Sequence, residues 1–168
     1  MPKWKFKAWK AILRKYNISA STTEPYHPHQ NRSERQIQEL KKVATRILDH
    51  TSAPDYLWFE ALSYATALLN HTSKQSLGWK TPLEVAFGVT SDISALVQFC
   101  FFESIYYFDA EASFPHSKEL PARFLGLAEN VGDALTFRIL TVDSTIIYRS
   151  VMRSALDSIN VNERALLT

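Results

Sequence analysis

A glutamate and a set of basic side chains share one segment with helical periodicity, and both residue types handle phosphate. The glutamate is Glu34. The basic residues are Arg35, Lys41, Lys42 and Arg46. At about 100° per residue, Glu34 and Lys41 lie within about 20° of each other around the helix. Carboxylates bind Mg²⁺, and Lys and Arg bind phosphate oxygens. The pattern fits a face that handles nucleic acid. Its alternatives are a glutamate that favours the helix dipole and an ordinary solvated helix face.

Charge is divided unevenly along the 168 residues, which carry a net charge of +2. Residues 1–46 hold eleven Lys or Arg and three acids, a net charge of +8, whereas residues 47–168 hold eight against fourteen, a net charge of −6. Such an asymmetry indicates a polyanionic partner. The five lysines among residues 1–16, with Trp4, Phe6 and Trp9, form a second candidate for contact with nucleic acid. The alternative for residues 6–16 is an amphipathic surface helix.

Other kinds of site find little support. Cys100 is the only cysteine, which excludes an internal disulfide and a multi-cysteine zinc site, and its aromatic neighbours predict a buried thiol. His27 and His29 stand in a proline-containing turn, where we interpret them as turn residues. No apolar stretch approaches about 18 residues, and the first residues lack the apolar core of a secretory signal. We therefore expect an intracellular protein, nuclear or cytoplasmic, with no membrane and no small-molecule substrate.

Helices are predicted in the first half of the chain. Residues 33–50 carry an apolar stripe at helical spacing, made by Ile37, Leu40, Ala44, Ile47 and Leu48. Residues 54–70 carry a second stripe, made by Trp58, Leu62, Ala65, Leu68 and Leu69. A short third helix is predicted from Thr81 to Gly88, with the threonine as its cap and the glycine as its end.

Strands are predicted in the second half, where β-branched and aromatic residues concentrate. They fall in the aromatic run 96–109 and in residues 123–129, 134–140 and 145–152. The chain is therefore expected to be α+β, with a small antiparallel sheet or barrel. The predicted divisions are a mainly helical part at 1–90, a strand and linker segment at 91–122, a β domain at 123–155 and a tail at 156–168.

Several short motifs, in order, resemble those of retroviral-type integrases, most closely those of copia-type retrotransposons. The first is EPYHPHQNRSER, which opens a helix and contains Pro25-Tyr26, Gln30-Asn31 and Glu34-Arg35. The others are Trp58-Phe59-Glu60-Ala61 with Asn70, TPLEVAFG at 81–88, RFLGLAE at 123–129 and RSVMRS at 149–154. The resemblance implies the C-terminal half of an RNase H-like catalytic core over residues 1–90, followed by a small β domain that contacts DNA.

The resemblance also implies a chemistry, DNA integration by phosphoryl transfer with Mg²⁺ or Mn²⁺. Glu34 matches one of three metal-binding carboxylates in that family, and residues such as Arg35, Lys41, Lys42 and Arg46 match its DNA contacts. The two aspartates would fall at or before Met1, so we expect this chain alone to bind no metal and to be inactive. The alternative functions are a non-catalytic DNA-binding or scaffold remnant and a pseudogene product.

The missing half of such a core would also supply the sheet on which the helices pack. The apolar stripe of residues 54–70 should then lie exposed, and self-association through it is a further expectation.

Overall fold

The computed structural model describes residues 10–17, 32–90, 92–128, 131, 135–157 and 160–163. Contacts divide the chain into two units, Met1–Gln38 and Glu39–Thr168, and each is described by itself. In the first unit, residues 10–15 are helical, as the basic amphipathic pattern predicts. Trp4, Phe6, Trp9, His27 and His29 lie outside the described residues.

Helix α2 spans Arg32–Thr51 and runs from the first unit into the second. Its predicted apolar stripe is confirmed over residues 40–48, where Ala44 is buried and its apolar neighbours pack on the core. Those neighbours are Leu40, Val43, Ile47 and Leu48. Ile37, the first predicted member of the stripe, is instead 53% exposed. Only the second half of α2 is therefore amphipathic in its packing.

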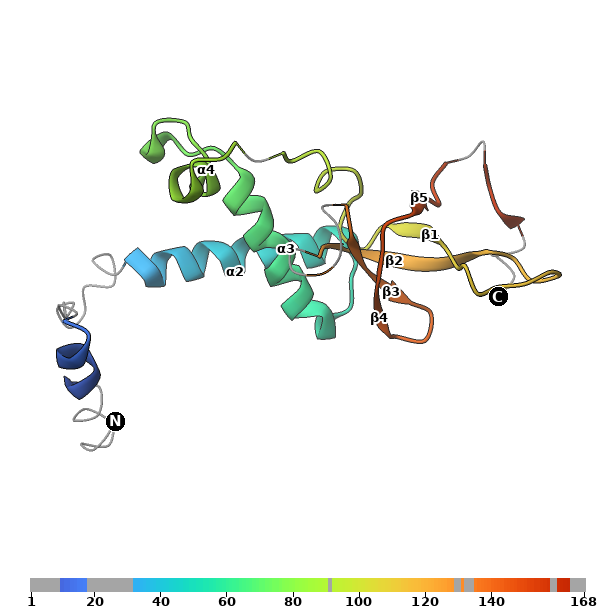
Figure 1. The fold of residues 1–168 in the computed structure, drawn as a ribbon, viewed down its shortest axis with the longest axis horizontal. Helices are drawn as coiled ribbons and strands as arrows, with labels where there is room; N and C mark the ends of the chain where they lie inside the picture. The colour runs from blue at the N-terminus through green and yellow to red at the C-terminus, as the bar shows by residue number, and fades with distance from the viewer. Residues whose placement is uncertain are drawn as a thin grey trace. The chain divides into compact units, whose positions relative to one another are not determined.

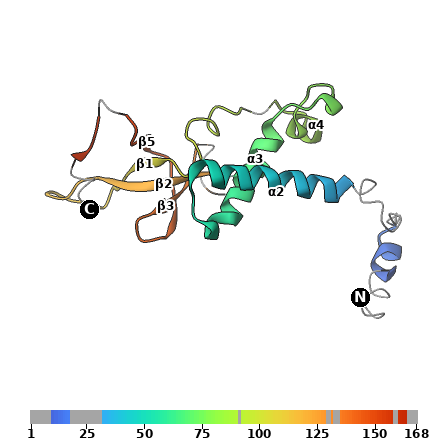
Figure 2. The same ribbon diagram turned by 180° about the vertical axis from the view of Figure 1, so that it is seen from behind.

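Helix α3 spans Trp58–His71 after a 3₁₀ turn, η2, at Asp55–Leu57, and it crosses the C-terminal part of α2 (Figures 1 and 2). Its buried face contains Ala61, Tyr64 and Ala65. The predicted stripe is therefore wrong at Trp58, which is 57% exposed. The helix has apolar residues on more than one side, and the side with two alanines allows the closest approach to the sheet.

The expectation that this helix lacks a sheet to cover is also wrong for its buried face. Tyr64 contacts the rings of Phe101 and Phe124 at centroid distances of 5.5 and 6.2 Å. Phe124 lies in strand β2 (Glu119–Leu127) and is fully buried. The antiparallel sheet of this chain thus covers the face of α3 that contains Tyr64.

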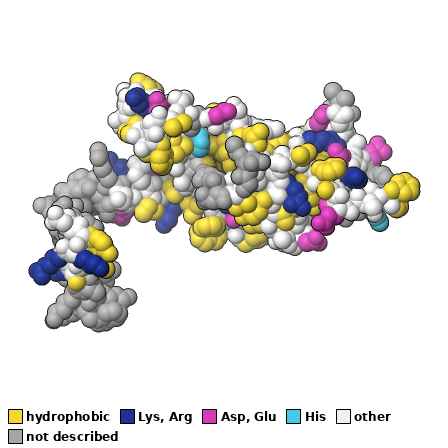
Figure 3. Space-filling model, in the orientation of Figure 1, with side chains coloured by type: hydrophobic (Ala, Val, Ile, Leu, Met, Phe, Trp, Pro, Cys, Tyr) yellow, Lys and Arg dark blue, Asp and Glu magenta, His cyan; other side chains and the backbone are white. Residues whose placement is uncertain are grey.

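Helix α4 spans Pro82–Phe87 and follows the 3₁₀ turn η3 at Gln75–Leu77. Its ends are the ones that the sequence predicts. The Thr81 hydroxyl accepts a hydrogen bond from the Glu84 N–H at 3.1 Å, and Gly88 ends the helix with a φ of 70°. This left-handed backbone conformation is more favourable for glycine than for a residue with a side chain. Phe87 is 74% exposed, and Figure 3 shows hydrophobic side chains at the surface in this region.

The second half of the chain forms one open five-stranded sheet in the order β4-β3-β2-β1-β5 (Figure 1). The strands besides β2 are β1 (Ser104–Phe108), β3 (Phe137–Thr141), β4 (Ile146–Arg149) and β5 (Met152–Ser154). All four pairings are antiparallel. The α+β class is therefore confirmed, and the sheet is open. The domain boundaries predicted at residues 90, 122 and 155 stay predictions, as does the relation to an integrase core.

The core lies between this sheet and α3, and one bulge fits the two together. The pairing of β2 with β3 shifts between Phe124 and Gly126. Gly126 has a φ of 137°, and a Cβ atom placed there would lie 3.3 Å from Tyr64 Cδ2. The absence of a side chain at this position therefore permits the Tyr64 ring to approach the strand.

A polar pair crosses the same interface. Arg138 Nη1 of β3 lies 2.9 Å from Glu60 Oε2 of α3, and the two side chains are 17% and 13% exposed. The geometry is that of an ion pair without a well-directed hydrogen bond, because Glu60 Oε2 has no hydrogen-bond donor among the described residues. Arg138 Nε is also buried without an acceptor in that part of the chain. The interface thus contains a charge pair whose hydrogen bonding is incomplete.

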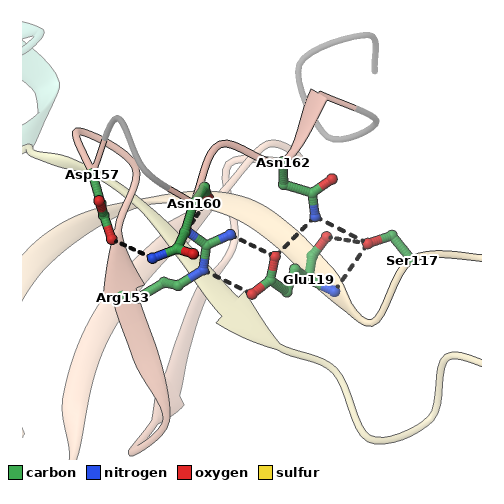
Figure 4. Close-up of polar contacts among 6 residues, drawn as sticks. All are labelled: Ser117, Glu119, Arg153, Asp157, Asn160 and Asn162. Carbon is green, nitrogen blue, oxygen red and sulfur yellow. Dashed lines mark hydrogen bonds and ion pairs between the residues drawn. The ribbon is translucent and has the colours of Figure 1, made fainter.

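Polar contacts hold the residues that follow β5 against the start of β2 (Figure 4). Arg153 donates from Nε and Nη2 to the two carboxylate oxygens of Glu119 at 2.8 and 2.7 Å. Asn162 donates to the same carboxylate at 2.9 Å, and Asn160 accepts from Arg153 through its carbonyl. These hydrogen bonds lower the pKa of Glu119, with that from Arg153 the largest cause.

Candidate nucleic-acid interface

All five site residues predicted from the sequence lie on α2, and all five are exposed. Glu34 stands in the first turn of the helix, next to Arg35. Lys41, Lys42 and Arg46 belong to the second unit. The predicted helix is thus present, and the carboxylate and the cations are at the surface; their roles stay predictions.

Packing of the second half of α2 determines where its cations point. Val43, Ala44 and Ile47 contact the core, so the opposite side of the helix is left to solvent. Lys42 and Arg46 are four residues apart and therefore lie on one side, separated by about 6 Å along the axis. Neither forms an ion pair with another described residue. Both cations are therefore available to an anionic partner.

A groove that the sequence analysis does not predict lies beside Arg46. It has a volume of about 750 Å³ and is lined by α2, Tyr64 of α3 and the Cys100-Phe101 pair that precedes β1. Arg46 stands among its lining residues. Because the lining comes from three separated segments, no local pattern could have predicted the groove.

Cys100 lies in this groove and is exposed, so the prediction of a buried thiol is wrong. The reason is a local turn in which the Cys100 N–H donates to the Glu103 carboxylate at 2.8 Å. The neighbouring rings of Phe99 and Phe101 are buried instead. Burial raises the pKa of Tyr64, and the negative potential of Cys100 and Glu103 adds to the shift.

The metal chemistry implied by the integrase resemblance finds no complete ligand set. Two-metal phosphoryl transfer requires several carboxylates around one point. Among the described residues, no group of three His, Cys, Asp or Glu side chains is placed to hold a metal ion. The described residues therefore do not fit such a centre, and Glu34 remains one predicted ligand of it.

The described helices also include none that is long and apolar enough to cross a membrane. The most distinct feature of this surface is the set of exposed cations on α2, and the same helix lines the groove.

Comparison of this chain with protein-family models and with curated protein sequences finds no match.

Proposed function

We propose that this chain is part of a copia-type retrotransposon integrase and that its described residues contact DNA without sequence preference. The observation that carries the DNA contact is the exposed cationic side of α2, with Lys42 and Arg46 one turn apart. The net charge of +8 over residues 1–46 supports it, because polyanion binding depends on summed charge. The family assignment rests on the order of the sequence motifs.

Helix α2 suits phosphate contact more than base recognition. Its cations are long and exposed, and phosphate oxygens accept hydrogen bonds from Lys and Arg whatever the base sequence. Binding should therefore be driven by counterion release and should weaken steeply as salt is raised. The alternative is that these cations bind a partner protein with an acidic surface, in which case the chain acts as a scaffold remnant.

The test is a fluorescence-anisotropy titration of the chain with labelled duplex DNA at several salt concentrations. The variant pair Lys41→Glu with Lys42→Glu should weaken binding at low salt. It should also reduce the slope of log K against log salt by about 2, one unit for each lost phosphate contact. Duplexes of different sequence should bind alike.

The matched control is Lys80→Glu with Lys118→Glu, which changes the net charge equally at exposed lysines outside α2. Retained binding in the control shows that position, and not total charge, matters. Equal loss in both pairs, or an affinity that does not change with salt, would refute the α2 interface.

Catalysis is tested separately with an end-labelled DNA substrate and Mg²⁺ or Mn²⁺. We expect no nicking and no strand transfer by these 168 residues, because no group of three His, Cys, Asp or Glu side chains among the described residues is placed to hold a metal ion. Turnover that disappears in Glu34→Gln would show that the chain is an active enzyme and would reject the non-catalytic reading.

A further inference from the structure

We propose that the open edge of strand β4 pairs with β4 of a second copy of this chain. The sheet order places β4 at one end, and in the described part of the chain no strand pairs with its outer side. An edge strand presents unpaired N–H and C=O groups that serve as a template for another strand. The other edge strand, β5, has only three residues and offers less backbone.

The direction of the free backbone groups follows from the pairing with β3. Thr141 N–H bonds to the Thr145 carbonyl at 2.9 Å, and alternation along an antiparallel ladder then directs Ile147 toward β3. Ile146 and Tyr148 consequently direct their N–H and C=O groups toward the open edge. The Tyr148 carbonyl indeed accepts from the Arg149 side chain at 2.9 Å, a contact that a second strand would replace.

This alternation makes β4 complementary to itself. In a two-fold antiparallel pair centred on Ile147, Ile146 of each copy faces Tyr148 of the other. The backbone N–H and C=O groups of both residues point toward the other copy. Each of the two Ile146–Tyr148 pairs therefore exchanges two hydrogen bonds, which gives four in all. A shift of one residue would oppose Ile146 with Ile147, whose groups bond toward β3, so no ladder could form. The backbone therefore favours a register with a defined centre.

Side chains favour the same arrangement. Ile146 and Tyr148 are 37% and 42% exposed, and an aromatic residue opposite a β-branched one is a favourable cross-strand pair. The strand contains no proline or lysine, the residues that commonly protect an edge. Arg149 is the one charged residue of the strand, and it stands at the strand's end.

Charge complementarity selects the antiparallel orientation and a second copy as the occupant. Asp143 precedes β4, and Arg149 ends it, and both are exposed. Antiparallel pairing brings the acidic end of one strand beside the basic end of the other. Parallel pairing would place like charges together. A short interface of this kind should be weak and reversible.

The first experiment is sedimentation velocity of the 168-residue chain over a series of concentrations. The wild type should form dimers reversibly. Ile146→Lys places a charge at the edge and should weaken association at least tenfold. Val89→Lys, the same kind of substitution at an exposed residue outside the sheet, should not. Unchanged circular dichroism and melting would show that each variant is folded.

The second experiment tests which residues of the two β4 strands face each other. In a Cys100→Ser background, Ile147→Cys should form a disulfide dimer under mild oxidation, because facing residues at the centre have Cα atoms about 4.5 Å apart. Thr145→Cys should not, since the two copies of residue 145 would be about 13 Å apart along the strands.

Three results would overturn the proposal. The first is a monomer at every concentration. The second is equal cross-linking from positions 145 and 147, which indicates unspecific association. The third is association that Ile146→Lys leaves intact and Trp58→Lys removes, which would place self-association on the exposed side of α3 instead.

Discussion

The ion pair between Glu60 and Arg138 joins α3 to β3, and its removal tests whether this contact fixes the helix on the sheet. The two side chains are only 13% and 17% exposed, and their charged atoms are 2.9 Å apart. Removing one partner of a buried pair costs about 3–5 kcal/mol, chiefly because the other charge is left buried and uncompensated. Since both side chains retain some contact with solvent, we expect about 2–3 kcal/mol for Glu60→Gln or Arg138→Met.

The double variant should behave differently from the sum of the two. With both charges replaced, no buried charge is left unpaired, and the unsatisfied Arg138 Nε is removed as well. We therefore expect the double variant to lie within about 1 kcal/mol of the wild type. The coupling free energy between the two positions should then exceed about 2 kcal/mol.

The assay is urea denaturation followed by far-ultraviolet circular dichroism, with all four proteins at one pH and salt concentration. The control is Lys80→Met, which removes an exposed cation outside α3 and β3 and should change the free energy of unfolding by less than about 0.5 kcal/mol. Additive effects of Glu60→Gln and Arg138→Met would refute the reasoning, because the two charges would then not depend on each other.

Substitutions at three further positions test the bulge, the helix cap and the polar contacts after β5. Gly126→Ala should cost about 1–3 kcal/mol in thermal unfolding, because it strains a φ of 137° and crowds Tyr64; no loss would mean that the strand shifts freely. Thr81→Ala should cost about 1 kcal/mol through the lost cap, and Thr81→Ser should not. Arg153 lowers the pKa of Glu119 from its ordinary value of 4.5. The pair therefore stabilises the fold fully at a pH above that ordinary value. This stabilisation is lost as the pH falls through the lowered pKa of the folded state. Glu119→Gln should flatten that acid limb of the stability profile, and an unchanged limb would contradict the assignment.

The sequence predicts the elements of this fold better than their packing. Helix α4 is predicted almost to the residue, because Thr81 and Gly88 are local signals that act through their own neighbours. The apolar run that contains β1 is likewise predicted by composition. The place of β5 beside β1 is not, since that pairing joins residues about fifty positions apart and no local pattern contains it.

The buried side of α3 shows why a periodic stripe can mislead. Trp58 is large and apolar, so hydrophobicity alone favours burying it. The observed interface leaves Trp58 exposed and fully buries Ala61, which lies outside the predicted stripe, beside Ala65, which belongs to it. Small residues let the helix lie close to the sheet, and the absence of a side chain at Gly126 leaves room for Tyr64 at that short distance. This choice depends on the partner surface, which a single helix does not encode.

In the candidate site, too, the features set by neighbouring residues can be predicted from the sequence, and the features set by distant residues cannot. The cations of α2 can be found from the sequence because a helix of known period fixes which side chains share a side. Whether they reach solvent depends on the packing of Val43, Ala44 and Ile47, and that packing leaves Lys42 and Arg46 exposed. The groove beside Arg46 needs Tyr64 and Cys100 from elsewhere in the chain and could not be predicted. DNA binding by α2 and strand pairing by β4 therefore rest on separate elements. Each can fail without the other, because Ile146 lies outside α2 and Lys42 lies outside the sheet.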